Sequence, residues 1–219
     1  MNVPFYIIVI FISFIASIAG LALVKENRTP RMFFFTIFLL SSLLVEYFGW
    51  KMSSHNGNTI ALYNYFTLFE FCFYLLFMRT AFSNMLIRRI IIFVVAGYFI
   101  FTVINIFYIQ GKNNFHSHTY VLGCTLIVIF SIVYFNSIFR HPETGSLTRN
   151  SHFWITTGLM FYYTCTFSLY GLENFITKTI QQYNTLLFFI GDLLNILLYT
   201  LFSIGVLCKI NTRKLLRLS

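Results

Sequence analysis

Charge is scarce in this 219-residue chain: only 10% of its residues are Asp, Glu, Lys or Arg, against about 25% in an average soluble domain. Hydrophobic residues make up 58%, above the roughly 45–50% that is typical of soluble proteins. The basic residues are scattered between apolar runs rather than clustered on one face, which argues against a nucleic-acid-binding module. The composition therefore predicts an integral membrane protein that has membrane lipids as neighbours and no nucleic-acid partner.

Proline is also rare, and Pro4, Pro30 and Pro142 all fall outside the middle of an apolar run. Because a proline inside a helix removes a backbone donor and breaks the helix, its absence from these runs predicts continuous helices. The strands of a membrane β-barrel would alternate apolar and polar residues over segments of about ten residues. The apolar runs of this chain are about twice that length and do not alternate, which favours an all-α membrane protein.

Seven apolar runs are long enough to cross the hydrocarbon core of a bilayer, which takes about 20 helical residues. We therefore predict a single domain over residues 1–219, a bundle of seven transmembrane helices. The predicted spans are Val3–Val24, Met32–Trp50, Thr59–Met78, Ile90–Ile109, Tyr120–Phe139, His152–Leu172 and Thr185–Cys208.

The distribution of Lys and Arg predicts the orientation of this bundle. Twelve of the fifteen basic residues follow the first, third, fifth and seventh runs, and the opposite side has only Lys51, Lys112 and Lys178. Since cytoplasmic loops are enriched in Lys and Arg, we expect the N-terminus outside and the C-terminus in the cytoplasm. The tail Lys209–Ser219 interleaves leucines with cations and is expected to bind anionic lipid of the inner leaflet.

Cysteine and histidine do not form a recognisable metal or redox motif. Cys72, Cys124, Cys165 and Cys208 lie inside predicted spans or at their ends, without a CxxC pair, and are expected to be small packing residues. His116 and His118 form an H-x-H pair on the same side as His55, but a zinc site also needs ligands held on rigid elements nearby. The sequence therefore predicts no metal and no cofactor.

Three of the six acidic residues, Glu46, Glu70 and Asp192, fall inside predicted spans. An ionisable side chain in hydrocarbon costs several kcal/mol unless it faces protein or water, so each is a candidate functional residue. No Lys or Arg inside a span balances these carboxylates. A carboxyl group that can change its proton is suited to sensing, proton coupling or acid/base chemistry.

Helical spacing places further polar residues on the faces that carry these acids. We expect the polar stripes to turn toward one another around a cavity that opens to the outside, although hydroxyls and amides also join membrane helices without any ligand. The predicted cavity residues are Glu70, Asp192, Glu46, Asn195, Tyr63, Thr67, Tyr163, Thr166, Tyr170 and Tyr199.

Short strings around these residues resemble a family of small, uncharacterised bacterial seven-span inner-membrane proteins. The matching residues are Tyr65, Thr67, Leu68, Glu70 and Phe71, then Phe153, Trp154, Ile155, Gly158 and Tyr162, then Leu194, Asn195, Tyr199, Ile204 and Gly205. The resemblance covers about residues 62–208. It implies a multi-pass protein of the bacterial inner membrane and favours a sensory role with a protein signalling partner, and it implies no known chemistry.

The function that we expect is that of a receptor or sensor whose bundle binds a small or lipid-like ligand. Two alternatives use the same carboxylates. The first is an intramembrane enzyme that acts on lipids, with Glu70 and Asp192 as general acid and base. The second is a proton-coupled transporter. In each case we expect Glu70 to matter most, because it lies deepest and is expected to be neutral at pH 7, and Glu46 to tolerate substitution best.

Overall fold

A computed structural model of the chain describes residues 3–55, 57–111, 114–140, 146–171 and 182–209, without the side chains of 170–171 and 182–188. The described residues form helices and short connections, and no strand occurs among them. Short helical turns are η1 (Lys25–Asn27), η2 (Asn105–Ile109) and η3 (Leu147–Arg149). The long helices are α1 (Phe5–Leu23), α2 (Pro30–Ser54), α3 (Ile60–Arg79), α4 (Met85–Ile104), α5 (Ser117–Arg140), α6 (Ser151–Gly171) and α8 (Gln182–Leu207).

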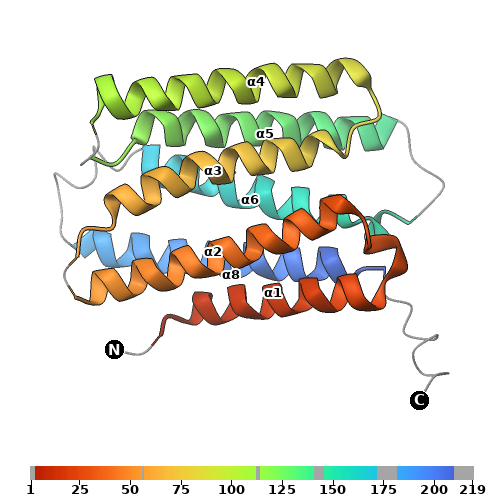
Figure 1. Ribbon diagram of the computed structural model, residues 1–219, viewed down its shortest axis with the longest axis horizontal. Helices are drawn as coiled ribbons and strands as arrows, with labels where there is room; N and C mark the ends of the chain where they lie inside the picture. The colour runs from red at the N-terminus through yellow and green to blue at the C-terminus, as the bar shows by residue number, and fades with distance from the viewer. Residues whose placement is uncertain (1–2, 56, 112–113, 141–145, 172–181, 210–219) are drawn as a thin grey trace.

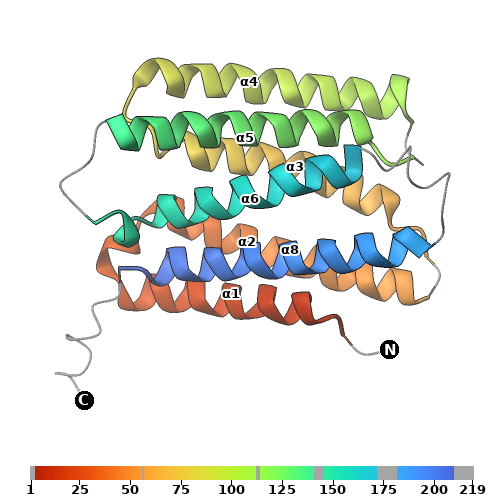
Figure 2. The ribbon, with the colours of Figure 1, turned by 180° about the vertical axis from the view of Figure 1, so that it is seen from behind.

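The long helices run side by side along one axis of the molecule (Figure 1). Helices α4 and α1 lie at opposite edges of the bundle, and α2 and α3 lie on the face toward the viewer. The view from behind shows α6 and α8 on the other face (Figure 2). The most extensive helix contacts join α6 to α8 and α5, and α1 to α8.

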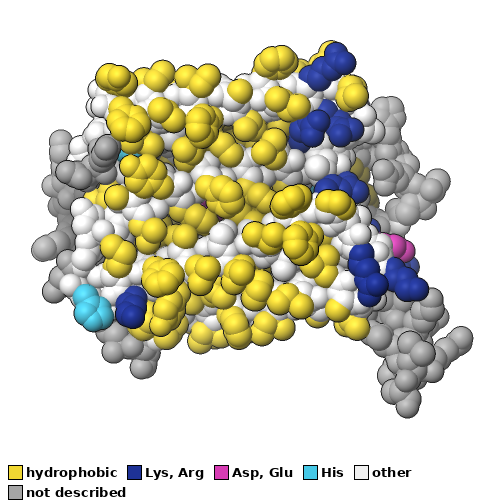
Figure 3. Space-filling model, in the orientation of Figure 1, with side chains coloured by type: hydrophobic (Ala, Val, Ile, Leu, Met, Phe, Trp, Pro, Cys, Tyr) yellow, Lys and Arg dark blue, Asp and Glu magenta, His cyan; other side chains and the backbone are white. Residues whose placement is uncertain are grey.

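Six of these helices are long and apolar enough to cross a membrane: α1, α2, α3, α4 with η2, α5 and α8. The all-helical architecture predicted from the sequence is thus confirmed as that of a multi-pass membrane protein. Helix α6 has 21 residues and packs between α5 and α8, but its several Thr and Tyr residues make it less apolar than its neighbours. The surface of the bundle is largely hydrophobic (Figure 3), with Phe5 64% exposed and Phe93 76% exposed. Such side chains are suited to contact with lipid tails.

The helix starts follow local sequence signals. Helix α2 has Pro30 at its first position, where the missing amide costs nothing, and the Thr29 hydroxyl caps it by accepting from Met32 N at 3.4 Å. Asn84 caps α4 in the same way through Leu86 N. The π-turn η2, which prolongs α4, is followed by Gly111 at φ 76°, a left-handed conformation that glycine adopts without steric cost.

The centre of the bundle is filled by aromatic rings. Phe35, Phe38, Phe71, Tyr74 and Phe202 are all at most 1% exposed. The rings contact one another across α2, α3 and α8, with centroids of Phe35 and Phe202 5.2 Å apart and those of Phe38 and Tyr74 4.9 Å apart. This closely packed centre separates the two ends of the bundle.

One end of the bundle is strongly basic. It is formed by the ends of α1, α3, α5 and α8 and the starts of α2, α4 and α6, and Figure 3 shows Lys and Arg gathered there. The tail predicted to bind anionic lipid lies, beyond Lys209, outside the described residues. The described basic residues of this end are Lys25, Arg28, Arg31, Arg79, Arg88, Arg89, Arg140, Arg149 and Lys209.

Candidate functional site

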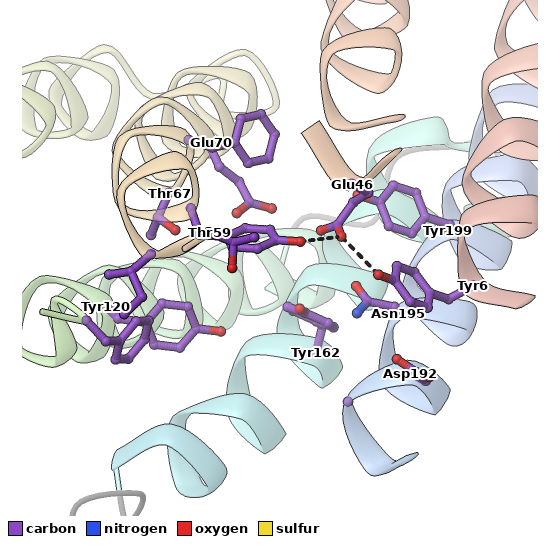
Figure 4. A pocket seen from close by; sticks show the side chains of 15 residues that line it. Tyr6, Glu46, Thr59, Thr67, Glu70, Tyr120, Tyr162, Asp192, Asn195 and Tyr199 are labelled. Carbon is purple, nitrogen blue, oxygen red and sulfur yellow. Dashed lines mark hydrogen bonds between the residues drawn. The ribbon is translucent and has the colours of Figure 1, made fainter. Parts of the chain in front are cut away.

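A cavity of about 370 Å³ opens at the end of the bundle that is remote from the basic loops. Its position follows from its lining, which includes residues of the first turns of α1 and α3 and the segment just before α5. Figure 4 shows the polar side chains of this lining converging from several helices. The cavity is lined by Tyr6, Glu46, Thr59, Ile60, Tyr63, Phe66, Thr67, Glu70, Phe115, Tyr120, Tyr162, Gly191, Asp192, Asn195 and Tyr199.

Glu46 joins three helices at one wall of this pocket. Its Oε2 atom accepts hydrogen bonds from the Tyr6 hydroxyl of α1 at 3.1 Å and from the Tyr63 hydroxyl of α3 at 3.2 Å. Gly49, one turn further along α2, leaves the room that the Tyr63 ring occupies, since a Cβ at this position would overlap the Tyr63 hydroxyl. The carboxylate of Glu46 is therefore held in place by two donors from neighbouring helices.

Glu70 forms the opposite wall and points across the pocket toward Glu46 (Figure 4). It lies on the face of α3 that also carries Tyr63 and Thr67, as the spacing of the three residues predicts. Behind the Glu70 carboxyl lie the hydroxyls of Tyr74 and Tyr163, each within its electrostatic reach. Both hydroxyls are buried and neither makes a hydrogen bond of standard geometry.

Asp192 lies at the mouth of the pocket on α8, and its side chain is exposed. Asn195 and Tyr199 follow it at intervals of three and four residues and continue along the same helix face into the pocket. Tyr199 is almost completely buried, at 4% exposure, and lies behind Glu46 (Figure 4). Within the described part of the chain, no Lys or Arg lines this pocket.

The helical spacing of polar residues predicted most of the polar residues that line the pocket. Seven of the predicted cavity residues do line the pocket: Glu46, Glu70, Asp192, Asn195, Tyr63, Thr67 and Tyr199. Tyr163 lies just behind the lining, next to Glu70. Thr166 is buried and donates to the Tyr162 carbonyl of its own helix at 2.9 Å instead of facing the cavity. The side chain of Tyr170 lies outside the described residues.

Five aromatic residues of the lining were not predicted from the sequence: Tyr6, Phe66, Phe115, Tyr120 and Tyr162. The first predicted span is almost wholly apolar, so Tyr6 is not part of a row of polar residues on one helix face. The signal that could have identified it is its hydroxyl in the outer turn of the span. Helical spacing predicted Tyr163 as a lining residue, but its immediate neighbour Tyr162 lines the pocket. Helices α1 and α5 thus join the four helices that were expected to surround the cavity.

The connection between α4 and α5 folds back over the start of α3 and brings Phe115 to the pocket. The buried Asn64 side chain binds it at two points, donating to the Asn114 carbonyl at 2.8 Å and accepting from the His116 amide at 3.2 Å. The Phe115 ring contacts Tyr120, with centroids 5.7 Å apart. Asn64 therefore determines where this part of the pocket wall lies.

The histidines near this end take part in local structure. His116 Nε2 lies 2.8 Å from the Gly111 carbonyl oxygen, and His55 Nδ1 lies 2.9 Å from the Lys51 carbonyl oxygen. Among the residues that the structure describes, no three His, Cys, Asp or Glu side chains lie close enough together to hold a metal ion.

Comparison of the chain with protein-family models, with curated proteins and with solved structures finds no match. The family resemblance drawn from short sequence strings therefore stays a prediction, and the geometry of the pocket carries the functional argument.

Proposed function

We propose that this protein is a seven-span receptor of a bacterial inner membrane, with its N-terminus outside, its C-terminus in the cytoplasm and α6 as a seventh span. Its ligand binds in the pocket formed by α1, α2, α3, α5, α6 and α8, which opens to the outside in this orientation. The excess of Lys and Arg at the opposite end supports the orientation. Three polar residues of α6, Thr156, Tyr163 and Thr166, are buried in the bundle, where polar side chains can join membrane helices, and this supports the place of α6 as a span.

The observation that carries the receptor proposal is that the pocket has a closed floor. Directly beyond Glu70 the interior is filled by Phe71, Tyr74 and Tyr163, all at most 1% exposed. A ligand that enters from the outer end meets packed aromatic rings rather than a path to the basic end. This favours a site that senses its ligand over one that passes it across the membrane.

A ligand would act on the packing of the helices, because the pocket wall is made of contacts between them. The hydrogen bonds of Tyr6 and Tyr63 to Glu46 connect α1, α2 and α3 at the place where a ligand would bind. A ligand that prefers one arrangement of these helices shifts the population of the bundle toward it. A partner protein at the basic end would then respond to that shift.

One-sided access to the pocket tests this proposal. Asn195→Cys and Thr67→Cys each place a thiol in the pocket, and Ser146→Cys places one on the exposed connection at the basic end. A membrane-impermeant methanethiosulfonate reagent is applied to intact cells and to inside-out vesicles. The unsubstituted chain, with four unpaired cysteines, supplies the background.

We expect both pocket thiols to react in intact cells only, and Ser146→Cys to react in inside-out vesicles only. Reaction of the pocket thiols from both sides would support a transporter and contradict the receptor. Reaction in the reverse pattern would overturn the orientation. Two pocket thiols that react from neither side would show that the pocket is closed to ligands.

A further inference from the structure

The pocket combines negative charge with aromatic walls, and this combination specifies a class of ligand. We propose that it binds a small organic cation, an ammonium or quaternary ammonium group on a short apolar body. The inference rests on the proposed function, since it names the ligand of the same pocket. It is carried by the placement of Glu70, Glu46 and Asp192 around one cavity with aromatic rings between them.

The three acidic side chains of the pocket have no Lys or Arg beside them among the described residues. Glu46 receives two neutral donors, and Asp192 forms no ion pair or hydrogen bond with any residue that the structure describes. The ion pair that the described residues do form joins Lys209 Nζ to Glu26 Oε2 at 3.9 Å and lies at the basic end. A partly buried carboxylate is stabilised strongly by an opposite charge, which a cationic ligand would bring.

The aromatic residues supply the second element of cation recognition. Tyr6 and Tyr63 donate to Glu46. Tyr199 lies beside Glu46, and Tyr120 and Tyr162 line the same cavity from α5 and α6 (Figure 4). The face of an aromatic ring carries partial negative charge and attracts a cation within about 6 Å of its centroid. A bare metal ion would gain little from such walls, whereas an alkylammonium group gains both this attraction and apolar contact.

The inner end of the pocket is suited to a charged carboxyl group. The hydroxyls of Tyr74 and Tyr163 make no hydrogen bond of standard geometry, but both lie close enough to Glu70 to interact with its carboxyl group. Both are fully buried and both lie beside Glu70, the carboxylate that a ligand reaches last. From behind the carboxyl, these hydroxyls can donate to the Glu70 oxygens while a cation approaches from the pocket, which would stabilise the charged form of the carboxyl.

Size limits the ligand as well. A volume of about 370 Å³ holds on the order of a dozen water-sized groups, at about 30 Å³ each. The exposed Asp192 at the mouth would attract a cation before it reaches Glu70, because clefts lined by one charge concentrate ions of the other.

Titration calorimetry on the purified full-length protein in detergent tests the proposal with matched pairs of probes. Choline is compared with its neutral isostere 3,3-dimethylbutan-1-ol, and tyramine with 4-propylphenol. Each pair differs only by replacement of the charged nitrogen with carbon. We expect at least one of the two cations to bind with a Kd below about 1 mM and its neutral counterpart to bind at least about tenfold more weakly.

The variants Glu70→Gln and Glu26→Gln separate the pocket from the rest of the protein. Both replace a carboxylate by an amide of the same size, but Glu26 lies at the basic end. We expect Glu70→Gln to weaken binding of the cation by at least about tenfold and Glu26→Gln to leave it unchanged. Thr67→Val, which alters the pocket without changing its charge, should have less effect than Glu70→Gln.

Several outcomes would overturn the proposal: no binding of either cation, equal binding of a neutral isostere, or equal loss in Glu26→Gln. Displacement of choline by sodium chloride but not by the same concentration of N-methyl-D-glucamine chloride would indicate an inorganic cation site instead. In any of these cases, labelling of Asn195→Cys from one side only would still support the proposal that the protein is a receptor. If that labelling is absent, both the receptor function and the organic-cation ligand are contradicted.

Discussion

The hydroxyl of Tyr6 donates a hydrogen bond of 3.1 Å to Oε2 of Glu46 and so connects α1 to α2 at the wall of the pocket. Because Tyr63 donates to the same oxygen, loss of one donor leaves the other in place. We expect Tyr6→Phe to lower the free energy of unfolding by about 0.6 kcal/mol, the mean for hydrogen bonds between membrane helices. Unfolding in detergent mixtures measures this change.

The matched control for Tyr6→Phe is Tyr65→Phe, which removes a hydroxyl from a residue of α3 that is 52% exposed. That variant should unfold like the unsubstituted protein. A Tyr6→Phe protein as stable as Tyr65→Phe would show that the bond to Glu46 contributes nothing to the packing of α1.

Glycines where two helices approach closely should not tolerate a methyl group. A Cβ at Gly20 in α1 would come within 2.7 Å of the Val206 carbonyl oxygen in α8, whereas a Cβ at Gly97 in α4 would meet nothing within 4 Å. The Val206 oxygen also accepts from Asn27 at 2.8 Å, so the contact cannot move freely. We expect Gly20→Ala to lower the melting temperature, with a cost of about 1–3 kcal/mol.

In contrast, Gly97→Ala should be neutral or slightly stabilising, because alanine has the higher helix propensity, by about 1 kcal/mol. Equal melting temperatures for Gly20→Ala and Gly97→Ala would contradict the close packing of α1 on α8.

The two hydrogen bonds from Asn64 to the connection between α4 and α5 predict a local effect. Asn64→Leu leaves the Asn114 carbonyl and the His116 amide without this partner, at a cost of about 1–3 kcal/mol for each buried group left unsatisfied. We expect faster hydrogen exchange at the His116 amide, while amides in the middle of α6 keep their protection. Asn58→Ala, which alters an exposed side chain at the start of α3, is the control. Equal exchange at His116 in both variants would show that Asn64 does not hold the connection.

Much of this arrangement could be read from the sequence because hydrophobic runs and helical spacing are local properties. The predicted run Tyr120–Phe139 corresponds to α5 (Ser117–Arg140), and His152–Leu172 corresponds to α6 (Ser151–Gly171). The larger differences are at α4, which begins at Met85 rather than at Ile90, and at α2, which continues past Trp50 to Ser54. The last turn of α2 is polar, and a search for apolar residues stops before it.

The composition of the pocket was harder to predict, because it depends on how each helix is rotated about its axis. A hydroxyl on a polar stripe has a second option, which is to donate to the carbonyl four residues earlier in its own helix. Thr166 and Ser203 take that option, with distances of 2.9 Å in both cases. Carboxylates have no such partner in the helix backbone, and Glu46, Glu70 and Asp192 all face the pocket as expected.

The same reasoning changes the expected ranking of the three acids. From sequence depth alone, Glu46 should tolerate substitution best, but it receives two hydrogen bonds from neighbouring helices, whereas Asp192 is exposed. We now expect Asp192→Asn to have the smallest effect on the melting temperature of the protein. A larger loss in Asp192→Asn than in Glu46→Gln would contradict this ranking.

The charge of the pocket makes a prediction that does not depend on the identity of the ligand. Two thiol reagents of the same size and opposite charge are compared at Asn195→Cys and at Ser146→Cys. We expect the ratio of cationic to anionic reaction rates to be at least about tenfold higher in the pocket, as focused negative potential favours cations. Addition of Glu70→Gln should lower this ratio, and an unchanged ratio would show that the Glu70 side chain carries no charge that the reagents sense.

Protection of the pocket thiol by a ligand tests whether the pocket is a cation site. The rate at which a neutral, impermeant thiol reagent modifies Asn195→Cys in intact cells is measured with and without choline or tyramine at saturating concentration. We expect the cation that binds to slow this reaction and its neutral isostere not to slow it. The reaction of Ser146→Cys in inside-out vesicles should keep its rate. If Asn195→Cys is modified at the same rate with and without the cation, the pocket is not a cation site.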